Sequence, residues 1–277
     1  MGDRLGERWL GLEAEGERAR LPVVTGLVSG AGALFGGCAT AVAIVVAQRI
    51  APQPIVWVAS HFGVLAKSGT VVELTARTIS PGRTMTHLEV AASVEGRESF
   101  TARVAAGERP AHDMQGQWVH PPDVDAIDDS AAFDHPVHVD TWAARFEWRL
   151  AGSARDPAQP WAAWWVRSRE PIDPLVEAAV LCDYVTYGMG RALGRSMGGL
   201  SIDNVLRVHS REAAATPGWR LLEVRPEWIT GGFGNGTSRL FAGSTLVASG
   251  TQSTVMNNWD WRLPEEQESE RATAGDG

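Results

Sequence analysis

The sequence predicts an α+β protein that contains one structural plan twice, a long helix followed by an antiparallel meander of strands. Three observations favour this fold class. The segment CATAVAIVVAQR, residues 38–49, is apolar on every side, as expected of a helix buried on all faces. Strand-like runs separated by short turns follow it. A helix and a meander then return in the second half, which indicates an internal duplication.

The composition is that of a folded protein long enough for two domains. The chain has 277 residues, of which 44% are apolar and 21% charged, so a packed core is expected. A net charge of −8 argues against a general nucleic-acid binder, which normally has a basic face. Two cysteines, Cys38 and Cys182, are too few for a disulfide framework and indicate buried thiols in a reducing, cytoplasmic compartment.

The first half begins with a charged leader that we expect to be irregular, followed by a candidate strand at residues 23–28. Gly36 and Gly37 then introduce the buried helix. Residues 21–48 carry no charge, but their five glycines and the acidic leader argue against a membrane span or a signal peptide. The strands expected after this helix are residues 54–62, 70–79, 84–94 and 98–105.

The second half follows a connector, residues 107–140, that is rich in Asp, Pro and His. A helix is expected at residues 174–193, with Asp173 at its cap and Pro174 in its first turn. The expected strands are residues 142–150, 161–169, 200–209, 219–228, 237–241 and 246–256. The predicted division is therefore an N-terminal unit (1–106), the connector (107–140), a C-terminal unit (141–261) and a polar, flexible tail (262–277).

Two polar residues in expected strands are the candidate catalytic pair. Asp203 lies in LSIDNVLRVHS, where a carboxylate is disfavoured by strand propensity. Gln252 lies in LVASGTQSTVM, beside the small residues Ala248 and Gly250. An Asp and a Gln brought together at a sheet could orient one water molecule. The alternative is structural: a solvent-facing Asp203 paired with Arg207, and a surface Gln252.

These two segments resemble the acyl-CoA thioesterase II family, and the resemblance extends over roughly residues 35–257. It implies a double hotdog fold, in which two antiparallel sheets each wrap around a long central helix. It also implies hydrolysis of acyl-CoA to a free acid and coenzyme A without metal or cofactor, in a homodimer or higher homo-oligomer that neither enters a membrane nor binds nucleic acid.

The same resemblance implies roles for individual residues. Asp203 would act as general base or anchor for the water, together with Gln252. The family has a Ser or Thr on the strand after the Asp. On the corresponding strand of this chain the nearest hydroxyl is that of Thr230. It could contact the water only if the strand has a bulge or a shifted register. Gly36 and Gly37 would bind substrate, because backbone N–H groups at a helix start can stabilise an oxyanion.

Three other functions are weaker on sequence grounds. Without the Ser or Thr that the family has beside the Asp and the Gln, the protein could be a non-catalytic acyl-CoA or lipid binder. A serine hydrolase is suggested by Gly194–Gly198, which fits G-x-S-x-G. However, a helix precedes Ser196 and a strand follows it, the reverse of a nucleophile elbow. An enoyl-CoA hydratase would pair Asp203 with His209, which are about 20 Å apart at strand rise.

Two residue clusters fit structural roles better than functional ones. The connector contains four histidines, His112, His120, His135 and His138. Their spacing matches no recognised zinc pattern, so no metal site is predicted. Of the twelve tryptophans, Trp142, Trp148, Trp161, Trp164 and Trp165 are expected in core and interdomain packing. An acyl-chain tunnel is the alternative use of these aromatic side chains.

Overall fold

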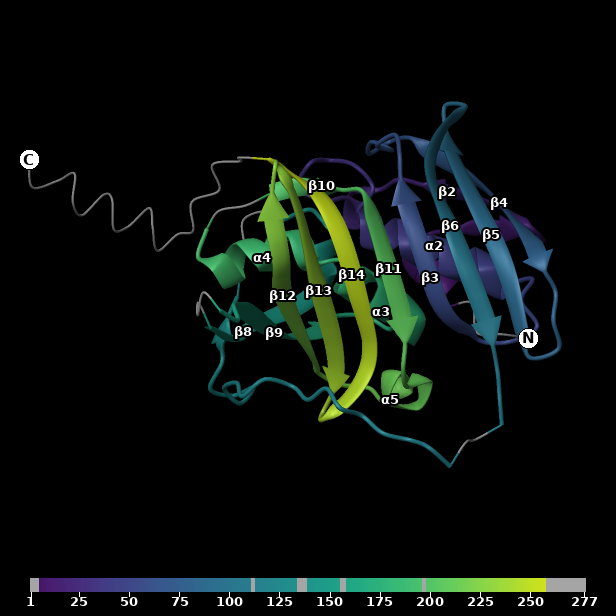
Figure 1. Ribbon diagram of the computed structural model, residues 1–277. Helices are drawn as coiled ribbons and strands as arrows, with labels where there is room; N and C mark the ends of the chain where they lie inside the picture. Colours follow the sequence, from purple (N-terminus) through teal and green to yellow (C-terminus); the bar gives the residue numbers. More distant parts are fainter. Residues whose placement is uncertain (1–4, 111–112, 134–138, 155–157, 196–197, 258–277) are drawn as a thin grey trace, which may run out of the picture.

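The computed structural model describes residues 5–110, 113–133, 139–154, 158–195 and 198–257. Strands lie side by side across the front of the molecule, with the helices behind them (Figure 1). The predicted α+β double hotdog fold is confirmed.

The N-terminal half contains one long helix and the first part of the sheet. Its elements are α1 (Leu5–Leu10), β1 (Glu13–Glu15), β2 (Arg18–Pro22), the 3₁₀ turn η1 (Thr25–Leu27), α2 (Gly36–Gln48), β3 (Ile55–Phe62), β4 (Val71–Ser80), β5 (Met85–Val94) and β6 (Arg97–Gly107). The four strands predicted after the helix are β3 to β6. The prediction of a strand at residues 23–28 is wrong, because the 3₁₀ turn η1 lies there. The strand lies earlier, at β2, in the segment that was expected to be irregular. There Ala19 and Leu21 alternate inward with outward arginines.

The central helix α2 is buried on all sides, as its uniform apolarity predicted. Every residue from Gly37 to Ala47 is buried. Among the described residues, no helix is both long and apolar enough to cross a membrane.

The C-terminal half repeats the plan with two interruptions. Its elements are β7 (Ala131–Ala132), η3 (Trp142–Arg145), β8 (Phe146–Ala154), β9 (Trp161–Ser168), α3 (Pro174–Cys182), α4 (Val185–Leu193), β10 (Gly198–Ser201), β11 (Asp203–Val208), α5 (Arg211–Ala215), β12 (Arg220–Thr230), β13 (Phe233–Ala242) and β14 (Thr245–Asn257). The helix predicted at residues 174–193 is broken at Asp183, and the strand predicted at 200–209 is broken at Ile202. Both interruptions lie in the candidate site.

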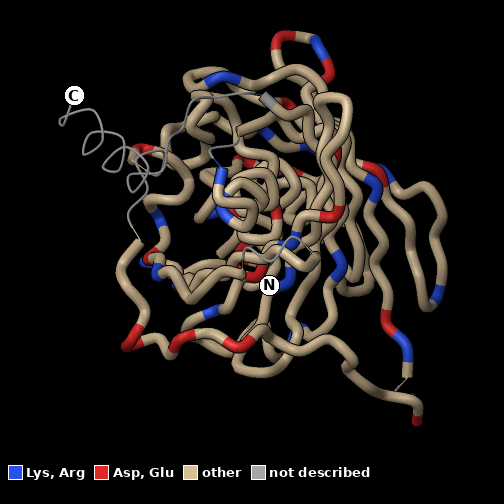
Figure 2. Tube along the Cα trace, turned by 60° about the vertical axis from the view of Figure 1, so that its left-hand side comes forward, with Lys and Arg blue, Asp and Glu red and all other residues tan. Residues whose placement is uncertain are grey.

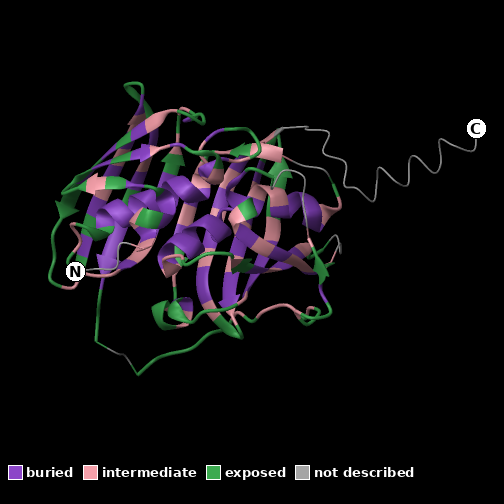
Figure 3. Ribbon diagram, turned by 180° about the vertical axis from the view of Figure 1, so that it is seen from behind, coloured by how far each residue is buried: buried purple, intermediate pink, exposed green. Residues whose placement is uncertain are grey.

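The two halves share one continuous sheet, in the hydrogen-bonded order β1-β2-β4-β5-β6-β3-β11-β14-β13-β12-β9-β8-β7, and β10 also pairs with β14. Strand β3 of the first half pairs antiparallel with β11 of the second, with Ser60 opposite Asn204. Helices α2 and α3 pack against each other on the inner face of this sheet. Seen from behind, both helices are almost entirely buried, whereas the outer edges are exposed (Figure 3). The seam therefore brings the start of α2 close to the end of α3.

The segment after β6 runs along the second half. Gln117 donates to the Ser244 carbonyl and accepts from the Leu246 N–H, both at 2.8 Å, which ties it to the turn before β14. The proposed domain boundaries stay a prediction.

Acidic and basic residues are interspersed along the trace (Figure 2). Ion pairs such as Arg77–Glu89 and Arg103–Glu89 join neighbouring strands.

Candidate active site

A buried carboxyl group, Asp183, lies where the second long helix breaks. Helix α3 begins at the predicted cap, where Asp173 accepts from the N–H groups of Leu175 and Val176. It ends at Cys182, and Asp183 adopts a non-helical backbone conformation with φ −85° and ψ 4°. Asp183 is only 2% exposed. A carboxyl group this deep in an apolar helix pair needs specific partners.

Two side-chain amides donate to the same oxygen of this carboxyl group. Gln252 Nε2 lies 2.7 Å and Asn204 Nδ2 2.5 Å from Asp183 Oδ1. Within the described part of the chain, Oδ2 has no hydrogen-bond partner. Burial raises the pKa of Asp183 from 3.8 to about 8. The negative charge of Asp203 also raises this pKa, whereas the hydrogen bond from Asn204 and the Gly37 N–H lower it.

The amide of Gln252 has a fixed orientation. Its Oε1 accepts from the Thr186 backbone N–H at 3.2 Å and from the Thr186 hydroxyl at 3.3 Å. Because a backbone N–H only donates, the amide nitrogen must face the other way, where it donates to Asp183 and to Ser201 Oγ at 2.7 Å. All four hydrogen-bonding positions of Gln252 are therefore occupied. Ser201 accepts this bond, so its hydroxyl proton can be donated elsewhere.

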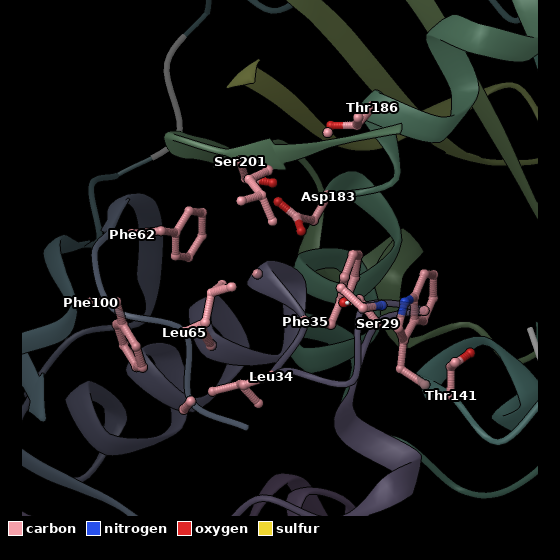
Figure 4. A pocket seen from close by; sticks show the side chains of 18 of the residues that line it. Ser29, Leu34, Phe35, Phe62, Leu65, Phe100, Thr141, Asp183, Thr186 and Ser201 are labelled. Atoms are coloured by element: carbon pink, nitrogen blue, oxygen red, sulfur yellow. Dashed lines mark hydrogen bonds between the residues drawn. The ribbon is translucent and has the colours of Figure 1, made fainter. Parts of the chain in front are cut away.

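A cavity of about 250 Å³ opens beside these groups. Asp183 and Ser201 lie close together on one of its sides, with Phe62 and Phe35 on its flanks (Figure 4). Both halves of the chain contribute, and most of the lining is apolar. The principal apolar side chains are Leu34, Phe35, Phe62, Val64, Leu65, Phe100, Trp142, Tyr184 and Tyr187. The geometry is a small apolar cavity with a carboxyl group and a hydroxyl group at one point of its wall.

The predicted glycine pair lies at this point. Gly36, the first residue of α2, lines the cavity. A Cβ on Gly36 would lie 2.7 Å from Asp183 Oδ2, and a Cβ on Gly37 would lie 2.8 Å from the Val180 carbonyl oxygen. Neither position has room for a side chain. The first turn of α2 also leaves backbone N–H groups without helical partners.

Asp203 and Gln252 do not converge, so the predicted shared water between them is wrong. Asp203 pairs across the ladder with exposed His61, and its Oδ1 accepts from the Ser253 N–H at 2.7 Å. The cause is a bulge. The register passes from Ser201 opposite Thr254 to Val205 opposite Thr251, which inserts one residue near Ile202. Ser201 faces the cavity, and Asp203 faces away from it.

Thr230 also lies away from the cavity. It is exposed at the end of β12, where it pairs with Phe233 across a turn formed by Gly231 and Gly232. The bulge that its role required is present between Pro226 and Trp228, but it does not bring the hydroxyl to the site. The hydroxyl near the buried carboxyl group belongs to Ser201 instead.

Sequence reasoning missed Asp183, Ser201 and Asn204. The best signal for Asp183 was the charge itself, because Asp183 is the one ionisable residue between Glu177 and Arg191 apart from cysteine and tyrosine. No single-sequence signal marked the bulge that turns Ser201 and Asn204 inward, since neither is a glycine or a proline.

The remaining candidates lie elsewhere. His209 Nε2 lies 2.8 Å from Ser249 Oγ and does not line the cavity. Ser196 and three of the connector histidines, His112, His135 and His138, are outside the described residues. In the described ranges no three His, Cys, Asp or Glu side chains gather to form a metal site.

The five tryptophans that were expected in packing are buried or half-buried, whereas Trp118 and Trp228 are exposed. Trp164 is fully buried, whereas Trp142 lines the cavity and stacks on Phe35 with centroids 4.3 Å apart and planes at 9°. Trp142 also meets Tyr184 edge-on at 5.8 Å. The aromatic wall beside Asp183 is therefore rigidly packed.

Comparisons with known proteins identify the family of the chain. The chain matches the acyl-CoA thioesterase N-terminal domain over residues 26–107 and the acyl-CoA thioesterase C-terminal domain over residues 120–256. No curated protein matches the chain closely enough to count as a relative.

Several solved structures are similar over nearly their whole length. A protein from Novosphingobium aromaticivorans, provisionally described as a thioesterase, is 28% identical, with a TM-score of 0.78 over 89% of this chain and 98% of that one. A hot dog fold protein of unknown function from Alicyclobacillus acidocaldarius is 18% identical, with a TM-score of 0.80 over 93% and 100%. The acyl-CoA thioesterase II TesB2 from Mycobacterium marinum is 17% identical, with a TM-score of 0.72 over 92% and 99%. The chain belongs to the acyl-CoA thioesterase family, whose N-terminal and C-terminal domains it matches.

Proposed function

We propose that this protein hydrolyses an acyl-CoA to a free acid and coenzyme A, with Asp183 in the role that the sequence suggested for Asp203. One observation carries the proposal. Asp183 lines an apolar cavity whose wall also holds the Ser201 hydroxyl, and its Oδ2 has no hydrogen-bond partner in the described chain.

The proposed chemistry needs only water and these side chains. A water molecule beside Asp183 Oδ2 can donate one proton to it and accept a hydrogen bond from the Ser201 hydroxyl. The water oxygen attacks the thioester carbonyl carbon while Oδ2 takes the proton. The C–S bond then breaks, and the proton passes from Asp183 to the departing thiolate. Gln252 acts by holding Asp183 and Ser201 in place.

The negative charge that develops on the carbonyl oxygen needs hydrogen-bond donors. The N–H group of Gly36 lies at the start of α2, where no helical carbonyl group takes it and where the helix dipole favours negative charge. The absence of a side chain at Gly36 lets a substrate approach this backbone.

The cavity also suggests the acyl group. Its lining is apolar beyond Asp183, Ser201 and a few hydroxyls, so it favours an uncharged hydrocarbon or aromatic acyl chain. The alternative of a non-catalytic acyl-CoA binder depended on a missing hydroxyl, and Ser201 supplies one.

Assembly into a homodimer or higher oligomer and a cytoplasmic location stay predictions from the family resemblance. Light scattering tests the oligomeric state.

A thiol-release assay over short, medium, long and aromatic acyl-CoAs tests the function. We expect wild-type protein to release thiol from at least one class, and Asp183→Asn to lower kcat by about a hundredfold or more, the usual contribution of a general base. Calorimetry on the same substrates separates the binder: saturable binding with no thiol release from any class would reject hydrolysis.

A further inference from the structure

Asn204 is a buried amide with an unusual environment. It is the first inward-facing residue of β11 after the bulge, and it is fully buried opposite Ser60 at the seam between the two halves. Leu206, two residues along the same strand face, is apolar and equally buried. Asn204 donates through Nδ2 to Asp183 Oδ1.

The oxygen of this amide, Asn204 Oδ1, accepts no hydrogen bond from any donor among the described residues. A buried carbonyl group without a donor destabilises the folded state, and an aliphatic side chain such as that of Leu206 would avoid this cost. Packing alone therefore does not account for an amide at position 204, but its hydrogen bond to Asp183 does.

We propose that Asn204 is a positioning residue for thioester hydrolysis, because it and Gln252 hold one oxygen of Asp183 and leave only the other to accept a proton from water. This inference rests on the proposed function. Two donors on Oδ1 fix the rotation of the carboxyl group, and they stabilise its ionised, basic form.

The surroundings of Asp183 make this role measurable. Asp203, the residue before Asn204 on β11, raises the pKa of Asp183 through its negative charge, whereas the hydrogen bond from Asn204 lowers this pKa. The thiols of Cys38 on α2 and Cys182 on α3 are also near, but burial raises the pKa of both well above neutrality, that of Cys182 to about 12. The pH dependence of activity below about pH 10 should therefore follow Asp183.

The test compares Asn204→Leu and Asn204→Asp with wild type. Asn204→Leu removes the donor, and Asn204→Asp replaces it with a group of the same size that repels the Asp183 charge. We expect kcat at pH 7 to fall about tenfold to a hundredfold with KM within about twofold, since charge-assisted hydrogen bonds have this strength. The rising limb of kcat/KM against pH should move upward by about one pH unit or more, and further for Asn204→Asp.

The control is Leu206→Val, a change on the same strand face that does not touch Asp183. It should lower the melting temperature without moving the pH profile. If both Asn204 variants lose activity by one constant factor at every pH, or lose none, the positioning role is overturned.

Carbon-13 NMR titration of Asp183 separates this inference from the proposed function. An unmoved Asp183 titration in the Asn204 variants, with wild-type thiol release intact, overturns the inference alone. A wild-type protein that releases no thiol from any acyl-CoA overturns the proposed function, and the positioning role with it, even where the titration moves.

Discussion

Replacing Asp183 by Asn should stabilise the protein while it abolishes activity, and the gain should grow with pH. The folded state raises the pKa of Asp183 from 3.8 to about 8 because the carboxyl group is buried. Between these values the unfolded chain releases the proton and the folded chain keeps it. The wild-type protein therefore loses stability as pH rises from about 4 towards about 8.

The structure sets the magnitude of this effect. One proton retained on folding corresponds to about 1.4 kcal/mol per pH unit, so the carboxyl group costs about 3–4 kcal/mol more at pH 8 than at pH 5. Asn fits the site, because its amide oxygen can accept from Gln252 and Asn204 as Oδ1 does. Its amide nitrogen then takes the place of Oδ2, which has no partner in the described chain.

The assay is urea unfolding of wild type and Asp183→Asn at pH 5, 6.5 and 8, followed by tryptophan fluorescence. The difference in free energy of unfolding should widen by about 3–4 kcal/mol over this range, roughly 10 °C in melting temperature for a chain of this size. Thr230→Val is the control, because it changes an exposed residue and no ionisable group, and its difference from wild type should not change with pH. A constant difference for Asp183→Asn would refute the claim that Asp183 is buried and largely protonated at neutral pH.

Further substitutions at four positions test other parts of the site and fold. Ser201→Ala should lower kcat about tenfold to a hundredfold in the thiol-release assay, because one hydrogen bond to the reacting water is lost. Ser201→Thr keeps a hydroxyl and should retain most activity. Thr230→Val should leave kcat within about twofold of wild type. Gly36→Ala places a Cβ 2.7 Å from Asp183 Oδ2, so kcat should fall at least about tenfold; unchanged kinetics would contradict the close packing of α2 on the carboxyl group. Arg220→Met leaves Glu177 buried without its partner at 2.9 Å and should lower the free energy of unfolding by about 3–5 kcal/mol in urea; a loss below about 1 kcal/mol would contradict the buried pair.

Much of the fold could be predicted from the sequence because its signals are local. The helix at α2 followed from a run of apolar residues with no polar face, and β3 to β6 followed from strand-forming runs between short turns. Strand β2 was missed because its alternation lies among charged residues, and its pairing with β4 depends on a distant partner.

The site was predicted only in part because its geometry depends on two irregularities. Gln252 and Gly36 lie at the buried site, where regular alternation and a helix start describe their surroundings, and their roles stay predictions. Regular alternation fails at Ile202, where one extra residue exchanges the faces of Asp203 and Asn204. The helix break at Asp183 results from long-range hydrogen bonds to β11 and β14, which periodicity cannot reveal.

The most direct test of the central claim is the rate of thiol release by Asp183→Asn beside that of Asp203→Asn, on the acyl-CoA that wild-type protein hydrolyses fastest. If Asp183 is the general base, Asp183→Asn loses about a hundredfold or more in kcat, whereas Asp203→Asn stays within about threefold of wild type. An inactive Asp203→Asn beside an active Asp183→Asn would rule out this role of Asp183.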